Sequence, residues 1–194
     1  MKTRYLVLLR GINVGGRNSV SMARLRRLLE DLGYSSVSTY IASGNALLTS
    51  DRPASEIKDR IEDALPRTFR LDSDLVSVLV LTHDELRRMI DGRHAGFGEE
   101  PDTYLCDAIF LMGVDSASAL DAFDPRPGVD TVWPGTGVIY SQRLAAERTK
   151  SRLNRVMGSA AYRSMTIRSW KTTQALLTLM EGAAPDDAAA DSEG

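Results

Sequence analysis

The sequence contains little of what several common classes of protein require. Its 194 residues include one cysteine, Cys106, and no apolar run approaches the roughly 20 residues that cross a bilayer. A single cysteine excludes an internal disulfide framework and is typical of a reducing cytosol. The apolar stretch at residues 5–9 is too short for a secretion signal. We therefore expect a cytoplasmic protein that does not associate with a membrane.

Side chains that would mark a catalytic or metal centre are also scarce. His83 and His94 have no histidine or cysteine partner at metal-ligand spacing, so we expect no metal site. Cys106 falls in a predicted strand, where a thiol is more often buried than nucleophilic. Since no cofactor motif is present either, the sequence predicts no cofactor and identifies no catalytic residue.

The net charge of −2 conceals a marked segregation of charge. Residues 2–29 contain seven basic side chains and no acidic one. Residues 142–171 contain eight basic side chains, with Glu147 as their only acid. Such segregation predicts a surface whose basic side attracts anions. For any single arginine, a solvated position on a helix face is the simpler alternative.

Hydrophobic periodicity predicts the same order of elements twice. In residues 1–92 the order is strand 4–9, helix 22–32, strands 36–41 and 46–50, a helix that ends or kinks at Pro66, strand 75–81 and a helix from 82 to 92. In residues 103–182 it is strand 105–112, a helix after Asp115, strands 129–133 and 138–141, helix 151–157, strand 165–168 and helix 170–180. Residues 93–102 are predicted as a linker and residues 183–194 as a disordered acidic tail.

Both halves are thus predicted as β-α-β-β-α-β followed by an extra helix. This is the ferredoxin-like order, so the predicted fold class is α+β with two ferredoxin-like halves. In such a plait the first strand ends at the same edge of the sheet as the hairpin between the second and third strands. Segments about 30 residues apart in sequence therefore become neighbours.

The most distinctive segment is the glycine-rich loop, residues 10–18, which follows the first predicted strand. Glycines allow a backbone to approach a ligand closely, and the next helix directs its positive end to the same place. The topology brings the turn at residues 43–45 beside this loop. The predicted anion site consists of Arg10, Gly11, Asn13, Gly15, Gly16, Arg17, Asn18, Ser43, Gly44 and Asn45. A plain turn is the alternative, because the Walker A and G-x-G-x-x-G patterns are missing.

A second basic group is predicted where the third and fourth strands of the second half end. Two predicted helices begin there, near Ser151 and Thr172. The indole of Trp170 is available to stack on the ring of a ligand. The commoner role of a tryptophan is to anchor its helix in the core. The predicted residues are Lys150, Arg152, Arg168, Trp170, Lys171 and Thr172. We expect the two basic groups to face one another.

Three motifs resemble a bacterial family known as domain of unknown function 1697. They are R-G-I-N-V-G-G at residues 10–16, followed by Asn18, Met22 and Leu25; T-Y-I-A-S-G-N at residues 39–45; and T-I-R-S-W-K-T at residues 166–172. The resemblance covers residues 3–182 in order. It implies a cytoplasmic α+β protein with a ferredoxin-like part, and it implies no activity. Ser169 stands where the family motif has asparagine, so an amide contact at that position is not carried over.

These observations leave three hypotheses. The first is a protein that binds an anionic, phosphate-bearing ligand, such as a nucleotide or nucleic acid. The second is an enzyme acting on a phosphorylated substrate, with Arg10 and Arg17 stabilising charge, although no general base is evident. The third is a structural or protein-interaction module without a ligand. An RNA-recognition sheet is disfavoured, because Tyr5 is the only aromatic residue on the two strands that would carry the stacking side chains.

Overall fold

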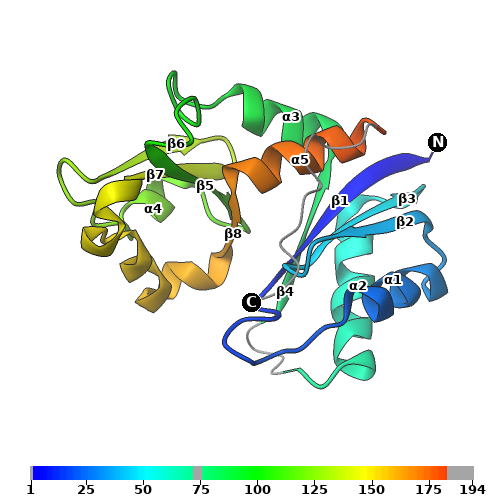
Figure 1. The fold of residues 1–194 in the computed structure, drawn as a ribbon. Helices are drawn as coiled ribbons and strands as arrows, with labels where there is room; N and C mark the ends of the chain where they lie inside the picture. The colour runs from blue at the N-terminus through cyan, green and yellow to red at the C-terminus, as the bar shows by residue number, and fades with distance from the viewer. Residues whose placement is uncertain (1, 72–75, 183–194) are drawn as a thin grey trace.

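The computed structural model describes residues 2–71 and 76–182, and it contains two four-stranded antiparallel sheets (Figure 1). The first sheet has the strand order β2-β3-β1-β4, and the second has the order β6-β7-β5-β8. The chain is therefore a mixed α/β protein, in agreement with the predicted class. The strands are β1 (Thr3–Arg10), β2 (Ser35–Tyr40), β3 (Asn45–Ser50), β4 (Ser77–Thr82), β5 (Tyr104–Leu111), β6 (Asp130–Gly135), β7 (Val138–Leu144) and β8 (Met165–Ser169).

The helices follow the predicted order, and α2 runs through Pro66 before it ends. Their bounds are α1 (Met22–Asp31), α2 (Ala54–Thr68), α3 (His83–Asp91), α4 (Ser116–Leu120) and α5 (Trp170–Met180). In the part of the chain that the structure describes, no helix is long and apolar enough to cross a membrane.

The predicted helix 151–157 is wrong. The segment instead forms short 3₁₀ helices, η1 (Ala145–Lys150), η2 (Leu153–Gly158) and η3 (Ala160–Ser164). The Arg155 N–H donates to the Arg152 carbonyl and the Ser159 N–H to the Val156 carbonyl, both at 2.9 Å, which is the i→i+3 spacing of a 3₁₀ turn. Consequently no α-helix begins at Ser151, and the convergence of two helix starts predicted for the second basic group is absent.

The two sheets separate the apolar interior into layers. On one face of the first sheet, the buried faces of α1 and α2 form a core that includes Leu25 and Ile57. On its opposite face, Leu6 and Leu8 join α3 and α5 in a middle core that extends to Tyr140 of the second sheet. In Figure 1, α3 and α5 lie side by side where the two sheets meet. Because both faces of the first sheet are covered, β1 is a continuous apolar run instead of an alternating one.

The predicted linker, residues 93–102, contains no helix or strand, but it does more than connect the halves. Phe97 is 1% exposed and belongs to the middle core. Its ring centroid lies 5.0 Å from that of Trp170 and 5.3 Å from that of Tyr140. The two halves therefore share a core across this segment. The predicted acidic tail, residues 183–194, lies outside the described residues.

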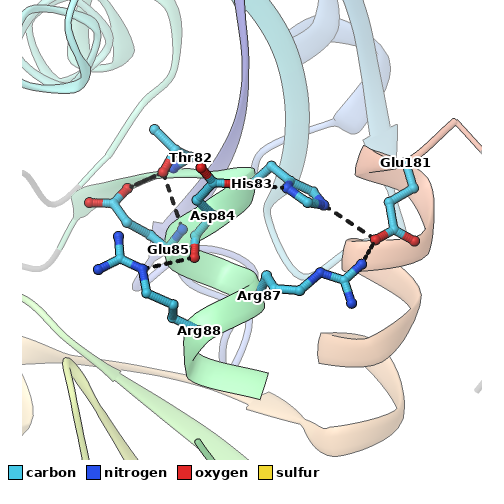
Figure 2. A network of polar contacts seen from close by, with 7 residues as sticks. All are labelled: Thr82, His83, Asp84, Glu85, Arg87, Arg88 and Glu181. Carbon is cyan, nitrogen blue, oxygen red and sulfur yellow. Dashed lines mark hydrogen bonds and ion pairs between the residues drawn. The ribbon is translucent and has the colours of Figure 1, made fainter. Parts of the chain in front are cut away.

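A polar network joins the start of α3 to the end of α5 (Figure 2). Thr82 and Glu85 form a capping box at the start of α3, since the Glu85 carboxylate accepts from the Thr82 N–H at 2.8 Å and Thr82 Oγ1 accepts from the Glu85 N–H. The His83 ring lies 3.1 Å from an Asp84 carboxylate oxygen and 3.2 Å from one of Glu181. Hydrogen bonds to these two carboxylates raise the pKa of His83 above its usual 6.5.

The raised pKa of His83 predicts a weak dependence of stability on pH. A raised folded-state pKa contributes stability that is fully present below about pH 6.5 and is lost as the pH rises through the folded-state value. The imidazole is more than a third exposed, so we expect a gain of a few tenths of a kcal/mol at most between pH 8 and pH 6. In the His83→Gln variant, the free energy of unfolding measured in urea should no longer show this gain between pH 8 and pH 6. Glu181→Gln should remove part of it, and an unchanged pH profile in both variants would contradict the assignment.

Candidate functional site

The tip of the glycine-rich loop is a small hairpin of its own. Val14 and Arg17 pair as an antiparallel bridge, and the Arg17 N–H donates to the Val14 carbonyl at 3.0 Å. Gly15 and Gly16 form the two-residue turn between them, with φ values of 56° and 72°. Such a turn needs positive φ at both positions, which explains the Gly-Gly pair. All four residues are exposed, so the tip projects into solvent.

The base of the loop is fastened by asparagine side chains. The Asn13 amide accepts from the Val20 N–H at 2.8 Å and donates to the carbonyls of Val20 and Ala42, at 3.0 and 2.8 Å. The Asn18 amide donates to the Gly11 carbonyl at 2.7 Å. Both asparagines have positive φ, a conformation that this residue tolerates well. The Asn13 and Asn18 amides predicted for an anion therefore make internal contacts.

The loop and the turn at residues 43–45 are neighbours, as the topology predicted. The Leu9 N–H donates to the Gly44 carbonyl at 2.8 Å. Gly44 has a φ of 78°, and a Cβ built on it would lie 2.7 Å from Ile12 Cδ1. The Asn45 amide, which is fully buried, donates to Ser43 Oγ at 2.9 Å. Gly44 is therefore required by the close approach of the two segments.

Arg168, from β8, reaches into this junction and joins the two predicted groups. Its Nε donates to Asn45 Oδ1 at 2.5 Å, and its Nη2 donates to the Leu9 carbonyl at 3.0 Å. Its Nη1 donates to Thr166 Oγ1 and to the Ile167 carbonyl, at 2.9 and 2.8 Å. Only 7% of the residue is exposed, and burial lowers the pKa of its guanidinium to about 10, so it stays charged at neutral pH.

Arg10 also turns inward at the same junction. It is 7% exposed, and its Nε donates to the carbonyls of Tyr162 and Met165, at 3.2 and 3.0 Å. Its guanidinium lies 5.0 Å from the centre of the Tyr162 ring. Burial lowers the pKa of Arg10, and the nearby charge of Arg163 lowers it further. The structure thus places two of the predicted ligand-binding arginines, Arg10 and Arg168, in contacts that connect the halves.

The third family motif continues from Arg168 into the start of α5. Trp170 is 5% exposed and belongs to the middle core, which is the commoner role expected for it. Ser169 Oγ accepts from the Thr172 N–H at 3.1 Å and caps the helix. Serine and asparagine are both good N-cap residues, so the departure from the family motif keeps this function. Lys171 is exposed.

The rest of the second basic group is dispersed over the 3₁₀ segment. Lys150 pairs with Glu147 at 2.6 Å, and Arg152 lies 3.3 Å from an Asp124 carboxylate oxygen. These two cations are therefore compensated by acids of their own half. Arg168 is the member of the group that contacts the first predicted site.

Exposed arginines are also found on α1. Arg24 and Arg27 are exposed, and the Arg24 guanidinium lies 5.1 Å from the centre of the Phe69 ring. None of the ion pairs found among the described residues involves Arg17, Arg24 or Arg27, and we call these three residues the basic surface. Of these three residues, Arg27 lines an open cavity of about 450 Å³, together with Ala23, Arg26, Glu30 and Thr39. The acid-free sequence of residues 2–29 was the signal for this surface, but no α1 arginine was among the predicted site residues.

A larger depression, of about 580 Å³, was not predicted. One wall comes from the first half and the other from the β6–β7 hairpin and the start of α4. It is lined by Arg88, Gly92, Asp115, Ser116, Pro134, Gly135, Thr136, Gly137 and Tyr140. Since the two walls belong to different halves, no local sequence pattern could have identified it.

Two turns of this region show exposed apolar side chains. Val14, at the loop tip, is 63% exposed, and Ile41, in the turn after β2, is 50% exposed. Ile41 has a φ of 47°, a conformation that is a genuine outlier for a β-branched residue. A left-handed backbone costs an ordinary L-residue roughly 1–2 kcal/mol.

Neither a metal centre nor an activated thiol is found in residues 2–71 and 76–182. No group of three or more His, Cys, Asp or Glu side chains there is placed to hold a metal ion. Cys106 is half-buried, and burial raises the pKa of its thiol, which disfavours the nucleophilic thiolate.

Comparison with known proteins identifies the family. Residues 1–140 match the family described as "Protein of unknown function (DUF1697)". The chain belongs to this family. It is also similar to a solved structure described as a conserved bacterial protein from Streptococcus pneumoniae, with 25% identity, a TM-score of 0.78, and coverage of 93% of this chain and 99% of that one. No curated protein matches the chain significantly.

The close packing around Gly44 predicts a large effect of a single methyl group. Gly44→Ala should lower the free energy of unfolding by about 2–4 kcal/mol, because it adds left-handed strain to a clash with Ile12 and Leu9. Gly15→Ala is the matched control, since nothing lies within 4 Å of its Cβ position, and it should cost only about 1 kcal/mol. Denaturant unfolding would measure both values. An equal loss in the free energy of unfolding in the two variants would contradict a stabilising contact between the loop and the turn.

The Arg168 junction predicts strong coupling between residues of the two halves. Arg168→Lys should destabilise the protein by about 2–4 kcal/mol, because an ammonium cannot serve the same four acceptors and is more strongly hydrated. In a double-mutant cycle with Asn45→Ala, we expect a coupling energy of about 1–2 kcal/mol. Additive effects in urea unfolding would contradict a direct stabilising contact between the two side chains.

Proposed function

We propose that this protein binds a phosphate-bearing ligand, and specifically a single strand of nucleic acid, along the basic surface of Arg17, Arg24 and Arg27. The observation that carries the proposal is the exposure of these three cations without an ion pair among the described residues. Each neutralised phosphate releases counterions, so exposed arginines of this kind favour polyanions.

The arrangement of the cations favours a strand over a small nucleotide. Arg17 lies at a projecting loop tip, Arg24 and Arg27 lie on α1, and the cavity that Arg27 lines is open. A small nucleotide would need donors that converge on an enclosed site, whereas a strand tracks along an extended positive surface.

The proposed surface lies at loops because the sheet faces are occupied. Leu6, Leu8 and Leu47 belong to the middle core, and the opposite face of the first sheet is covered by α1 and α2. The ligand would therefore not bind on the sheet itself, as it does in RNA-recognition domains. This agrees with the sequences of β1 and β3, in which Tyr5 is the only aromatic residue.

We also propose a more specific fold for each half and a location for the protein in the cell. We infer that each half is a ferredoxin-like plait, which the element orders and the strand orders 2-3-1-4 and 6-7-5-8 support. In the second half the 3₁₀ segment stands where the second helix of the plait is expected. A cytoplasmic location, expected from the single cysteine, is part of the same proposal.

A structural or protein-interaction module is the second candidate. The internal hydrogen bonds of the loop, with Asn13 holding Val20 and Ala42, favour it, because they explain the asparagines without a ligand. Catalysis on a phosphorylated substrate has weaker support, because Arg10 lies inside the junction.

The proposal predicts salt-dependent binding of a labelled single-stranded oligonucleotide. Fluorescence anisotropy between about 50 and 200 mM salt should give a linear fall of log K with log salt concentration. Arg17→Ala should weaken binding about 3–10-fold and reduce the slope by about 0.7, the contribution of one phosphate contact on a single strand.

Arg88→Ala is the matched control, because it removes one exposed arginine on α3, away from the basic surface. It should leave both affinity and slope nearly unchanged. If the protein binds no oligonucleotide at low salt, or if the two variants behave alike, the proposal is wrong and the module without a nucleic-acid ligand is favoured.

A further inference from the structure

We infer that Val14 and Ile41 form an apolar contact for the bases of the bound strand, beside the phosphate-binding arginines. This inference rests on the proposed function and adds to it the part of the ligand that the two side chains would touch. The phosphates alone would require only the basic surface.

The two side chains lie on adjoining turns. The Asn13 amide, next to Val14, donates to the carbonyl of Ala42, next to Ile41, at 2.8 Å. Both side chains are at least half exposed, and they are two of the four large hydrophobic residues found exposed in the described chain. Neither belongs to any of the hydrophobic cores. Packing of the fold therefore does not explain their apolar character.

The backbone of Ile41 makes the choice of isoleucine more unusual. Its φ of 47° lies in the left-handed region, which glycine and asparagine adopt with less strain. An isoleucine in this conformation strains the folded backbone while half of the residue stays exposed to water. Strained residues that persist despite such a cost are concentrated at functional sites.

A single strand of nucleic acid is a ligand that carries both the anionic and the apolar groups that this site would bind. Val14 pairs directly with Arg17 across the loop tip, so an apolar side chain and an uncompensated cation lie next to each other. A single strand presents phosphates and the apolar faces of unpaired bases at similarly short separations. Aliphatic side chains such as isoleucine insert between the base steps of bent duplex DNA, so the face of a base is a surface that they can contact. The charge complementarity of residues 2–29, which contain no acid, favours this polyanion over an apolar protein surface.

The experiment compares two labelled strands of about 12 nucleotides, one with bases and one abasic, by fluorescence anisotropy at low salt. The wild-type protein should bind the strand with bases about fivefold more tightly. Ile41→Asn keeps a residue that tolerates positive φ, and Val14→Thr keeps the side-chain shape. Each should reduce the preference for bases, the double variant should abolish it, and the salt slope should be unchanged. Ile41→Asn should also unfold at an equal or higher denaturant concentration, which shows that the loss is not due to misfolding.

The outcomes separate this inference from the proposed function. If Arg17→Ala changes the salt slope but the wild type binds both strands equally, the base contact is refuted and the basic surface is retained. If Ile41→Asn and Val14→Thr keep the full preference for bases, the inference is likewise wrong. If neither strand binds, the proposed function fails and the inference fails with it.

Discussion

The hydrogen-bonding requirement of one buried guanidinium organises the centre of this protein. Arg168 remains charged while it is almost completely removed from water, and this is tolerated only when its donors are satisfied. Its acceptors come from the end of β1, from Asn45 at the start of β3 and from β8 itself. Separation of these segments would leave a buried charge without partners. The same contact positions the glycine-rich loop, which begins immediately after Leu9.

The middle core, which the two halves share, limits which surfaces of the protein are available to a ligand. This core, which includes residues of α3 and α5, covers a face of each sheet, so these broad sheet surfaces are buried. Loop tips and helix surfaces remain for recognition. The glycine-rich loop suits this role because its own hydrogen bonds fix its shape before any ligand arrives, and preorganisation lowers the entropic cost of binding. Its internal bonding is therefore compatible with both a structural and a binding role.

Local sequence patterns predicted the order of strands and helices well, because periodicity and capping residues act over short distances. The helices predicted at residues 22–32 and 82–92 are examples, since the structure has α1 at Met22–Asp31 and α3 at His83–Asp91. The contact between the loop and the turn followed from topology. The prediction of a helix at residues 151–157 failed because the segment forms i→i+3 hydrogen bonds, such as that from the Arg155 N–H to the Arg152 carbonyl, and so becomes a 3₁₀ helix. Hydrophobic periodicity does not distinguish these two kinds of helix over so few residues.

The sequence by itself determined the family, the segregation of charge and the positions of the three motifs. Only the tertiary structure decided which arginines face solvent. Arg10 and Arg168 appear equivalent to Arg17 in the sequence, yet the first two are buried and the third projects from a loop tip. The physical reason is that burial depends on contacts between distant segments: Arg168 and Asn45 are 123 residues apart. Residue type and spacing specify which groups can bind an anion, whereas packing decides which of them are available to do so.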